Sequence, residues 1–205
     1  MTLATKDGRL VIISGSSRCG KTTQTERMIR PFKTAFIWDI EGQWCKLRGY
    51  VKVSTLQDLK KIVKSGKAGK YAFVSSGNIK AEFELFCMCV MFYGSHFGEC
   101  AIVAEELADV TSTAKAGEQW GMLCRRGLKR SISIFAISQR WAEADKTALG
   151  NATDFYLFRM ASGSDIDYMS RKTRVSIDKL ENLKPLQFIH YNALTGEVVA
   201  NKVKF

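Results

Sequence analysis

The sequence has few prolines and histidines and no long apolar run. Its 205 residues include 2 prolines and 2 histidines, and no Pro-rich or Gly/Ser-rich stretch is long enough to be a linker. The longest apolar run, residues 85–94, is about half the roughly 20 residues that a membrane-spanning helix needs. These absences argue against a tethered multidomain chain and a membrane span, and predict a single domain over residues 1–205.

The cysteines lack the spacing of a metal site or a disulfide framework. There are 6 of them, most lie within apolar runs, and no CxxC pair occurs. A zinc site is therefore not expected, and reduced thiols in a cytosol are the natural interpretation. The opening MTLATKDGRL has no apolar segment after a basic start, so we expect a soluble protein without a secretory signal.

Acidic residues are too few to balance the basic ones. The chain has 31 Lys and Arg against 20 Asp and Glu, a formal net charge of +11. A surplus of this sign indicates a polyanionic partner, either nucleic acid or a membrane surface, with general solubility as the alternative. The composition is otherwise that of a globular protein, with 46% hydrophobic and 25% charged residues.

Short apolar runs alternate with longer helical patterns along the chain. Strands are expected at residues 9–14, 34–40, 71–75, 100–104, 131–138 and 154–159, and helices at residues 21–30, 56–64, 81–93 and 119–128. Repeated βα units indicate parallel strands with helices on both faces. Residues 187–192 and 197–204 flank a Leu-Thr-Gly turn, which predicts a closing antiparallel hairpin.

The clearest motif is GSSRCGKT at residues 15–22, which matches G-x-x-x-x-G-K-[ST] at every defined position. It follows an apolar strand and opens a helix, so the loop amides and the helix N-terminus would face phosphate. Lys21 would reach the β- and γ-phosphates, and Thr22 would offer its hydroxyl to Mg²⁺. The expected nucleotide-binding residues are Gly15, Ser16, Ser17, Arg18, Cys19, Gly20, Lys21, Thr22 and Thr23. A chance glycine-rich turn is the alternative.

Cys19 lies within this loop and carries a separate hypothesis. A helix N-terminus lowers the pKa of a thiol. We therefore expect alkylating agents to inhibit the protein at Cys19, and a Cys19→Ser variant to lose that sensitivity.

Polar residues also end two later strands. Residues 101–106, AIVAEE, form an apolar strand that ends in two carboxylates. Beside the bound phosphates, Glu105 would hold Mg²⁺ and Glu106 would orient and deprotonate the attacking water; an exposed acidic turn is the alternative. Gln139 ends the next strand, where its amide would sense the γ-phosphate or position the water, although a structural turn fits equally well.

Together these segments resemble the FtsK/HerA superfamily of DNA-pumping ATPases, and within it the small genome-packaging ATPases of membrane-containing icosahedral viruses with double-stranded DNA. The resemblance covers most of the chain and rests on GSSRCGKT, FIWDIEGQW, IVAEE and AISQR. It implies an α/β P-loop NTPase fold of the RecA/ASCE type, a three-layer sandwich with a mostly parallel central sheet. It also implies ATP and Mg²⁺ as cofactors, and ATP hydrolysis coupled to translocation of double-stranded DNA into a preformed capsid.

The resemblance assigns roles by motif position. Lys21 and Thr22 correspond to the phosphate and Mg²⁺ ligands, Glu105 to the Walker B acid, Glu106 to the catalytic glutamate and Gln139 to the sensor. The Walker B residue is usually Asp, so the longer Glu105 would hold the metal in a different geometry.

The resemblance also implies a catalytic arginine that acts on a neighbouring subunit. The helix before the sensor strand commonly reads like R-x-G-R, whereas residues 125–130 are RRGLKR, with Leu128 at the place of the second arginine. Arg125 or Arg126 is the expected finger, with Arg130 a weaker candidate, and its loss should cost roughly 10³-fold or more in rate. A solvated helix end is the alternative.

A finger acting in trans implies a homo-oligomeric ring, a hexamer by resemblance, located in the host cytoplasm or at the packaging vertex of the virion. A capsid-vertex or membrane protein would anchor it. Cations in the channel would contact duplex phosphates without sequence preference. The candidates, each of which fits a solvated face equally well, are Lys60, Lys61, Lys64, Lys67, Lys70, Arg171, Lys172 and Arg174.

Two other functions compete with this interpretation. The first is a nucleoside-monophosphate kinase, because GKTTQ at residues 20–24 and the chain length resemble thymidylate kinases. Against it, the sequence shows neither an arginine-rich lid nor a D-R-[YH] motif, and a kinase has no use for a Glu-Glu pair that activates water. The second is a non-hydrolysing, nucleotide-gated binding module on a membrane, against which the retained Glu106 argues.

Overall fold

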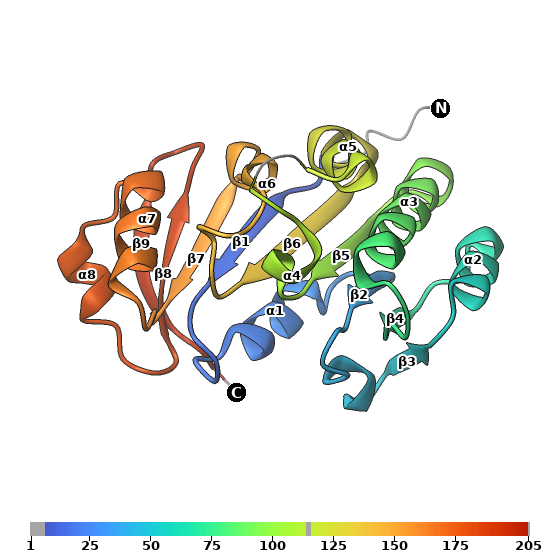
Figure 1. Ribbon diagram of the computed structural model, residues 1–205, viewed down its shortest axis with the longest axis horizontal. Helices are drawn as coiled ribbons and strands as arrows, with labels where there is room; N and C mark the ends of the chain where they lie inside the picture. Colours follow the sequence, from blue (N-terminus) through green and yellow to red (C-terminus); the bar gives the residue numbers. More distant parts are fainter. Residues whose placement is uncertain (1–6, 114–115, 205) are drawn as a thin grey trace.

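The computed structural model describes residues 7–113 and 116–204, which are built around one nine-stranded sheet (Figure 1). The strands lie in the order β3-β4-β2-β5-β6-β1-β7-β8-β9. Strands β1 to β7 pair in parallel, and β8 and β9 form the antiparallel hairpin at one edge. The bounds are β1 (Leu10–Ser14), β2 (Ala35–Trp38), β3 (Tyr50–Val53), β4 (Lys70–Phe73), β5 (Cys100–Ala104), β6 (Ile132–Ser138), β7 (Asp154–Phe158), β8 (Gln187–Asn192) and β9 (Val198–Lys202).

Helices cover the two faces of the sheet unequally. One face carries α2 (Leu56–Ser65), α3 (Ile79–Phe97), α4 (Leu107–Val110), α5 (Glu118–Arg126), α6 (Lys146–Gly150), α7 (Gly163–Thr173) and α8 (Ile177–Glu181), with the short 3₁₀ helix η2 (Leu128–Arg130). The other face carries α1 (Lys21–Ile29) and the 3₁₀ helix η1 (Trp44–Lys46). Each face has its own apolar core, so the predicted three-layer sandwich is confirmed, with one thick helical layer and one thin one.

The central strands are buried at every position, which explains why continuous apolar runs predicted them. All residues of β1, β5 and β6 are buried. A strand with helices on both faces has no solvent side and needs no polar alternation. The strands expected from sequence are all present, with small shifts at their ends, and the C-terminal hairpin is confirmed.

Strand β3, the helices α4, α6, α7 and α8 and the two short 3₁₀ helices were not expected from sequence. Strand β3 pairs only with β4, at the far edge of the sheet, and Val53 is its one buried residue. Helices α7 and α8 fill the connection between β7 and β8, a segment to which sequence assigned no element.

Residues 1–6 of the N-terminal segment, on which the absence of a secretory signal was argued, lie outside the described residues. Within the described part of the chain, no helix has the length and apolarity to cross a membrane.

Candidate active site

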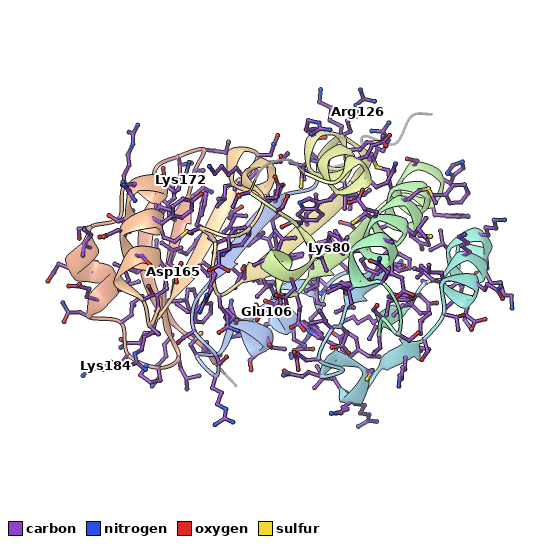
Figure 2. The ribbon with its side chains drawn as sticks, viewed as in Figure 1. Lys80, Glu106, Arg126, Asp165, Lys172 and Lys184 are labelled. Atoms are coloured by element: carbon purple, nitrogen blue, oxygen red, sulfur yellow. The ribbon has the colours of Figure 1, made fainter. Side chains whose placement is uncertain are left out.

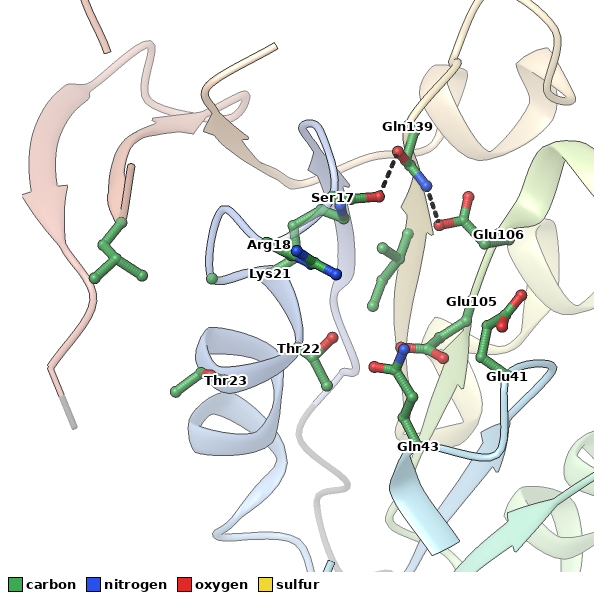
Figure 3. A pocket seen from close by; sticks show the side chains of 13 residues that line it. Ser17, Arg18, Lys21, Thr22, Thr23, Glu41, Gln43, Glu105, Glu106 and Gln139 are labelled. Atoms are coloured by element: carbon green, nitrogen blue, oxygen red, sulfur yellow. Dashed lines mark hydrogen bonds between the residues drawn. The ribbon is translucent and has the colours of Figure 1, made fainter. Parts of the chain in front are cut away.

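The sheet order brings the expected site residues to one edge. Strand β6 lies between β1, which leads into the glycine loop, and β5, which ends in the two glutamates. Because the strands are parallel, their carboxyl ends meet at the same edge of the sheet. A cavity of about 410 Å³ opens there (Figure 3). Its lining residues are Ser17, Arg18, Gly20, Lys21, Thr22, Thr23, Glu41, Gln43, Glu105, Glu106, Ile137, Gln139 and Leu186.

The glycine loop wraps around the ammonium group of Lys21. The Lys21 Nζ donates hydrogen bonds to the carbonyl oxygens of Gly15 and Ser16, at 2.8 Å and 2.7 Å, and the side chain is buried. The loop is tied to the end of β7, because the Ser16 amide and hydroxyl both donate to the Arg159 carbonyl oxygen, at 2.9 Å and 3.1 Å. Gly20 has a φ of 102°, a conformation that L side chains rarely adopt. The lysine is therefore held at the centre of the loop, as a phosphate-binding lysine requires.

Cys19 is not among the residues that line the cavity, and the expectation of a lowered thiol pKa is wrong, while inhibition by alkylating agents stays a prediction. Its side chain is only 3% exposed, and its Sγ would lie 3.0 Å from a Cβ placed on Gly15. Burial raises the pKa of the Cys19 thiol, and the nearby Lys21 charge offsets this only in part. The thiol thus stays protonated and shielded, although it lies in a loop that opens a helix.

Glu105 and Glu106 leave β5 in different environments. Glu105 is 7% exposed, and burial, with Asp39 and Glu106 nearby, raises its pKa to about 7, while the Trp44 indole and Lys21 act in the opposite direction. Glu106 has a left-handed backbone, with φ 43° and ψ 57°, and its side chain is only partly buried. The left-handed turn gives the two successive carboxylates different environments, because Glu105 is buried and Glu106 only partly so, while both line the cavity.

Gln139 connects the loop to Glu106. Its Nε2 donates to Glu106 Oε1 at 2.9 Å, and its Oε1 accepts from Ser17 Oγ at 3.1 Å (Figure 3). Since β6 lies between β1 and β5, a side chain at its carboxyl end is the one that can span both neighbours. The three groups thus form one hydrogen-bonded chain across the mouth of the cavity.

Two lining residues that sequence reasoning missed follow strand β2. Asp39 is fully buried, and its carboxylate accepts hydrogen bonds from the backbone amides of Gln43 and Cys45, at 2.8 Å and 2.9 Å. These bonds fold the segment back over the sheet edge, with Gly42 at a φ of 61°. Glu41 and Gln43 consequently line the cavity. The acid and glycine in FIWDIEGQW were the available signal.

A second cavity of about 660 Å³ adjoins the first. It shares Ser17, Glu41, Gln43, Glu106 and Gln139 with the first cavity and continues to Ala108, Asp109, Arg140 and Glu143. Carboxylates dominate its wall, and its one arginine is paired with Glu143 at 2.9 Å. This outer cavity therefore presents acidic groups in front of the glycine loop.

The expected arginine fingers lie away from this site. Arg125 and Arg126 are exposed at the end of α5, and neither lines the two cavities. Figure 2 shows Arg126 at one edge of the molecule, well away from Glu106, which lies near its middle. Helix α5 leads into the start of β6, whereas the site lies at the carboxyl end of that strand. Neither arginine can act on the cavity of its own chain.

The donor set at the glycine loop fits Mg²⁺. No group of three or more His, Cys, Asp or Glu residues that could hold a metal is present among the described residues. Mg²⁺ does not need one, because it usually binds one or two protein oxygens, several waters and substrate phosphates. Thr22 and Glu105, which line the same cavity, offer a hydroxyl and a carboxylate of this kind.

The parallel sheet, the glycine loop between β1 and α1 and the acidic end of β5 define a P-loop NTPase fold. No family model matches the sequence. The genome-packaging NTPase B204 of Sulfolobus turreted icosahedral virus 2, in complex with AMPPCP, superposes with a TM-score of 0.78 at 12% identity, over 97% of this chain and 98% of that chain. B204 of Sulfolobus turreted icosahedral virus, a DNA-packaging ATPase, gives a TM-score of 0.76 at 17% identity, over 99% and 100%.

A relative is also found by sequence. Protein P9 of Pseudoalteromonas phage PM2 is 29% identical over 184 residues, which are 86% of this chain and 81% of the relative. The predicted fold is confirmed by these comparisons, and the resemblance to viral packaging ATPases extends over nearly the whole chain.

Proposed function

We propose that the protein is the ATPase of a viral genome-packaging motor, which hydrolyses ATP to move double-stranded DNA into a preformed capsid. The proposal rests on the cavity that Lys21, Glu105, Glu106 and Gln139 line together. A fold shared from end to end with packaging NTPases supports the proposal.

The glycine loop and its neighbours would bind the nucleotide. Lys21 would exchange the carbonyl oxygens of Gly15 and Ser16 for β- and γ-phosphate oxygens, while the loop amides bind the remaining phosphate charge. Thr22 and Glu105 would hold Mg²⁺. When bound, this ion neutralises charge on the transferring phosphoryl group.

Glu106 is the proposed general base. Its carboxylate would accept a proton from the water that attacks the γ-phosphorus, while Gln139 orients the same water or senses the γ-phosphate. This pairing does not favour the thymidylate-kinase alternative, because phosphate transfer to a phosphate acceptor requires no base acting on water. It also opposes a non-hydrolysing module.

The catalytic arginine would come from a neighbouring subunit. Arg125 and Arg126 are exposed at the end of α5, away from their own cavity, and the outer cavity offers carboxylates and open space to an incoming guanidinium. Head-to-tail contacts of this kind close into rings, so a homo-oligomeric ring, by resemblance a hexamer, would be the active form. The ring would be located in the host cytoplasm or at the packaging vertex of the virion. A capsid-vertex or membrane protein would anchor it.

Duplex DNA would bind through exposed cations. Lys60, Lys61, Lys64 and Lys67 are exposed on and after α2, and Lys70 is half-buried. Arg171, Lys172 and Arg174 are exposed at the end of α7, which covers the same face at the opposite end of the sheet (Figure 1). Since the two groups lie far apart, we propose that one of them lines the channel of a given ring and contacts phosphates without sequence preference.

Product analysis tests the proposed function. The purified chain with ATP and Mg²⁺ should release inorganic phosphate, and duplex DNA should stimulate this release. Activity should rise more than linearly with protein concentration as rings assemble, and DNA affinity should fall steeply with salt. Transfer of phosphate to dTMP would support the kinase instead. ATP binding without turnover would support the non-hydrolysing module.

A further inference from the structure

The C-terminal hairpin reaches the glycine loop through two apolar side chains. A Cβ placed on Gly20 would lie 2.9 Å from Val203 Cγ2 and 3.1 Å from Leu186 Cδ2, so both side chains pack directly on this glycine. Leu186 lines the 410 Å³ cavity and is partly buried, whereas Val203 lies behind it in the core and is 3% exposed.

The position of Leu186 is fixed by the surrounding backbone. Its carbonyl oxygen accepts a hydrogen bond from the Val203 amide at 2.8 Å, and the Gln187 amide donates to the Lys184 carbonyl oxygen at 3.0 Å. Leu186 itself has a φ of 68°, which is uncommon for a leucine. A branched side chain kept in this conformation at the edge of a binding cavity points to a use beyond core packing.

Leu186 lies on the side of the loop where the nucleobase would extend. The groups that would act on the γ-phosphate, Glu105, Glu106 and Gln139, end β5 and β6, on one side of β1. Leu186 directly precedes β8 and reaches the loop from the other side of β1, next to β7. The γ-phosphate and the base are opposite ends of an extended nucleotide. A triphosphate directed toward Glu106 therefore carries its base toward Leu186.

We propose that Leu186, backed by Val203, forms an apolar shelf for the nucleobase, and that the protein consequently accepts other nucleoside triphosphates besides ATP. This inference rests on the proposed function. Leucine and glycine offer no side-chain hydrogen bond that would distinguish an amino group from a carbonyl on the base. The nearby Thr23 hydroxyl lines the same cavity, and it can both donate and accept.

The size of the selectivity follows from this chemistry. Sites that bind a substrate group by hydrogen bonds reject an analogue lacking it by about 10⁴-fold or more, whereas apolar contacts discriminate by roughly 10- to 200-fold. We expect kcat/KM for ATP and GTP to agree within about tenfold.

Binding measurements with and without a base test the shelf. Isothermal titration calorimetry with Mg²⁺ would compare ATP, GTP and inorganic tripolyphosphate. Leu186→Ala should lower the affinity for ATP and for GTP by about tenfold, the size expected for the loss of an apolar contact. Its affinity for tripolyphosphate should stay unchanged. Leu186→Met, which keeps an apolar side chain, should retain nucleotide affinity. The matched control is Leu194→Ala, because Leu194 is 80% exposed in the β8–β9 turn. This variant should bind all three ligands as the parent chain does.

The outcomes separate the shelf from the phosphate site. Equal losses for ATP and tripolyphosphate in Leu186→Ala would make Leu186 only a support of the loop and overturn the inference, as would a preference for ATP over GTP of about 10⁴-fold in the parent chain. A parent chain that binds neither ATP nor tripolyphosphate would instead overturn the proposed function, and the shelf with it.

Discussion

At the scale of single residues, burial of Glu105 opposes its ionisation and thereby affects stability. Its pKa is raised to about 7, so the folded chain holds this proton more tightly than the unfolded chain does. The associated stability is present below the ordinary glutamate pKa and is lost as the pH rises through 7. Above that pH, the ionised carboxylate destabilises the nucleotide-free protein by up to roughly 3 kcal/mol.

Glu105→Gln should therefore stabilise the nucleotide-free protein at pH 8 and have little effect at pH 5. The expected increase in melting temperature at pH 8 is roughly 5 °C or more, measured by scanning calorimetry without Mg²⁺. The control is Glu181→Gln in α8, an exposed carboxylate, which should change the melting temperature equally at both pH values. A Glu105→Gln shift that does not depend on pH would contradict the effect of burial.

Two substitutions separate nucleotide binding from hydrolysis. Glu106→Gln removes the proposed base but keeps a side chain of similar shape that Gln139 can still contact, so ATP binding should persist while hydrolysis stops. Lys21→Ala removes the charge at the centre of the loop and should weaken both. Nucleotide titrations and phosphate release measure the two quantities. Undiminished hydrolysis by Glu106→Gln would assign the base to another carboxylate.

The residues that sequence identified are those whose position follows from local order. Lys21 is placed by its own loop, and Glu106 by the end of its own strand. Glu41 and Gln43 depend on the bonds that Asp39 makes to the following turn, and Leu186 comes from the far end of the chain. The expected lowering of the Cys19 thiol pKa is wrong for a related reason, because the helix N-terminus is a local feature, whereas the packing of distant elements buries the thiol and raises its pKa.

At the scale of elements, helix α3 approaches β6 closely through a glycine. A Cβ placed on Gly94 would lie 2.4 Å from Ile132 Cγ1 and 2.5 Å from its Cδ1, and Ile132 is fully buried. Gly94→Ala would gain about 1 kcal/mol of helix propensity, but overpacking typically costs about 1–3 kcal/mol.

We therefore expect Gly94→Ala to lower the free energy of unfolding by about 1 kcal/mol, measured by urea denaturation. The matched variant is Gly163→Ala at the start of α7, where a Cβ would have no neighbour within 4 Å. It should leave stability unchanged or increase it by up to about 1 kcal/mol. Stabilisation by Gly94→Ala would mean that Ile132 moves away at little cost.

The elements that sequence missed give weak periodic signals. Strand β3 exposes most of its residues at the edge of the sheet, so it lacks the continuous apolar run that marks β1 or β5. Helix α7 has only Ile166, Met169 and Thr173 fully on its buried side, and α8 buries only Leu180. Their positions follow from the need to cover β7 and β8, which is a tertiary requirement.

At the scale of the whole molecule, the surplus of positive charge lies largely outside the active site. The two adjoining cavities contain Glu41, Glu106, Asp109 and Glu143 but few cations. Groups of exposed cations lie on α2, at the end of α5 and at the end of α7, outside the two cavities, whereas the exposed Arg18 and Arg140 line them. Under the proposed function, this distribution would attract DNA to surfaces away from the cavity and would leave an acidic opening for a guanidinium from a second copy.

Mixing two inactive variants tests whether the site is completed by a second copy. Glu106→Gln keeps both arginines, and the double substitution Arg125→Ala with Arg126→Ala keeps an intact cavity. Each alone should lose about 10³-fold or more in hydrolysis. In mixed rings, half of the cavities are intact and half of those would face an intact α5, so an equimolar mixture should recover about a quarter of the parent activity.

Lys33→Ala, which removes one exposed charge elsewhere, is the control for net charge and should hydrolyse ATP as the parent does. A mixture as inactive as its components would exclude an arginine acting in trans from this helix, and an arginine variant that is active alone would exclude the finger altogether.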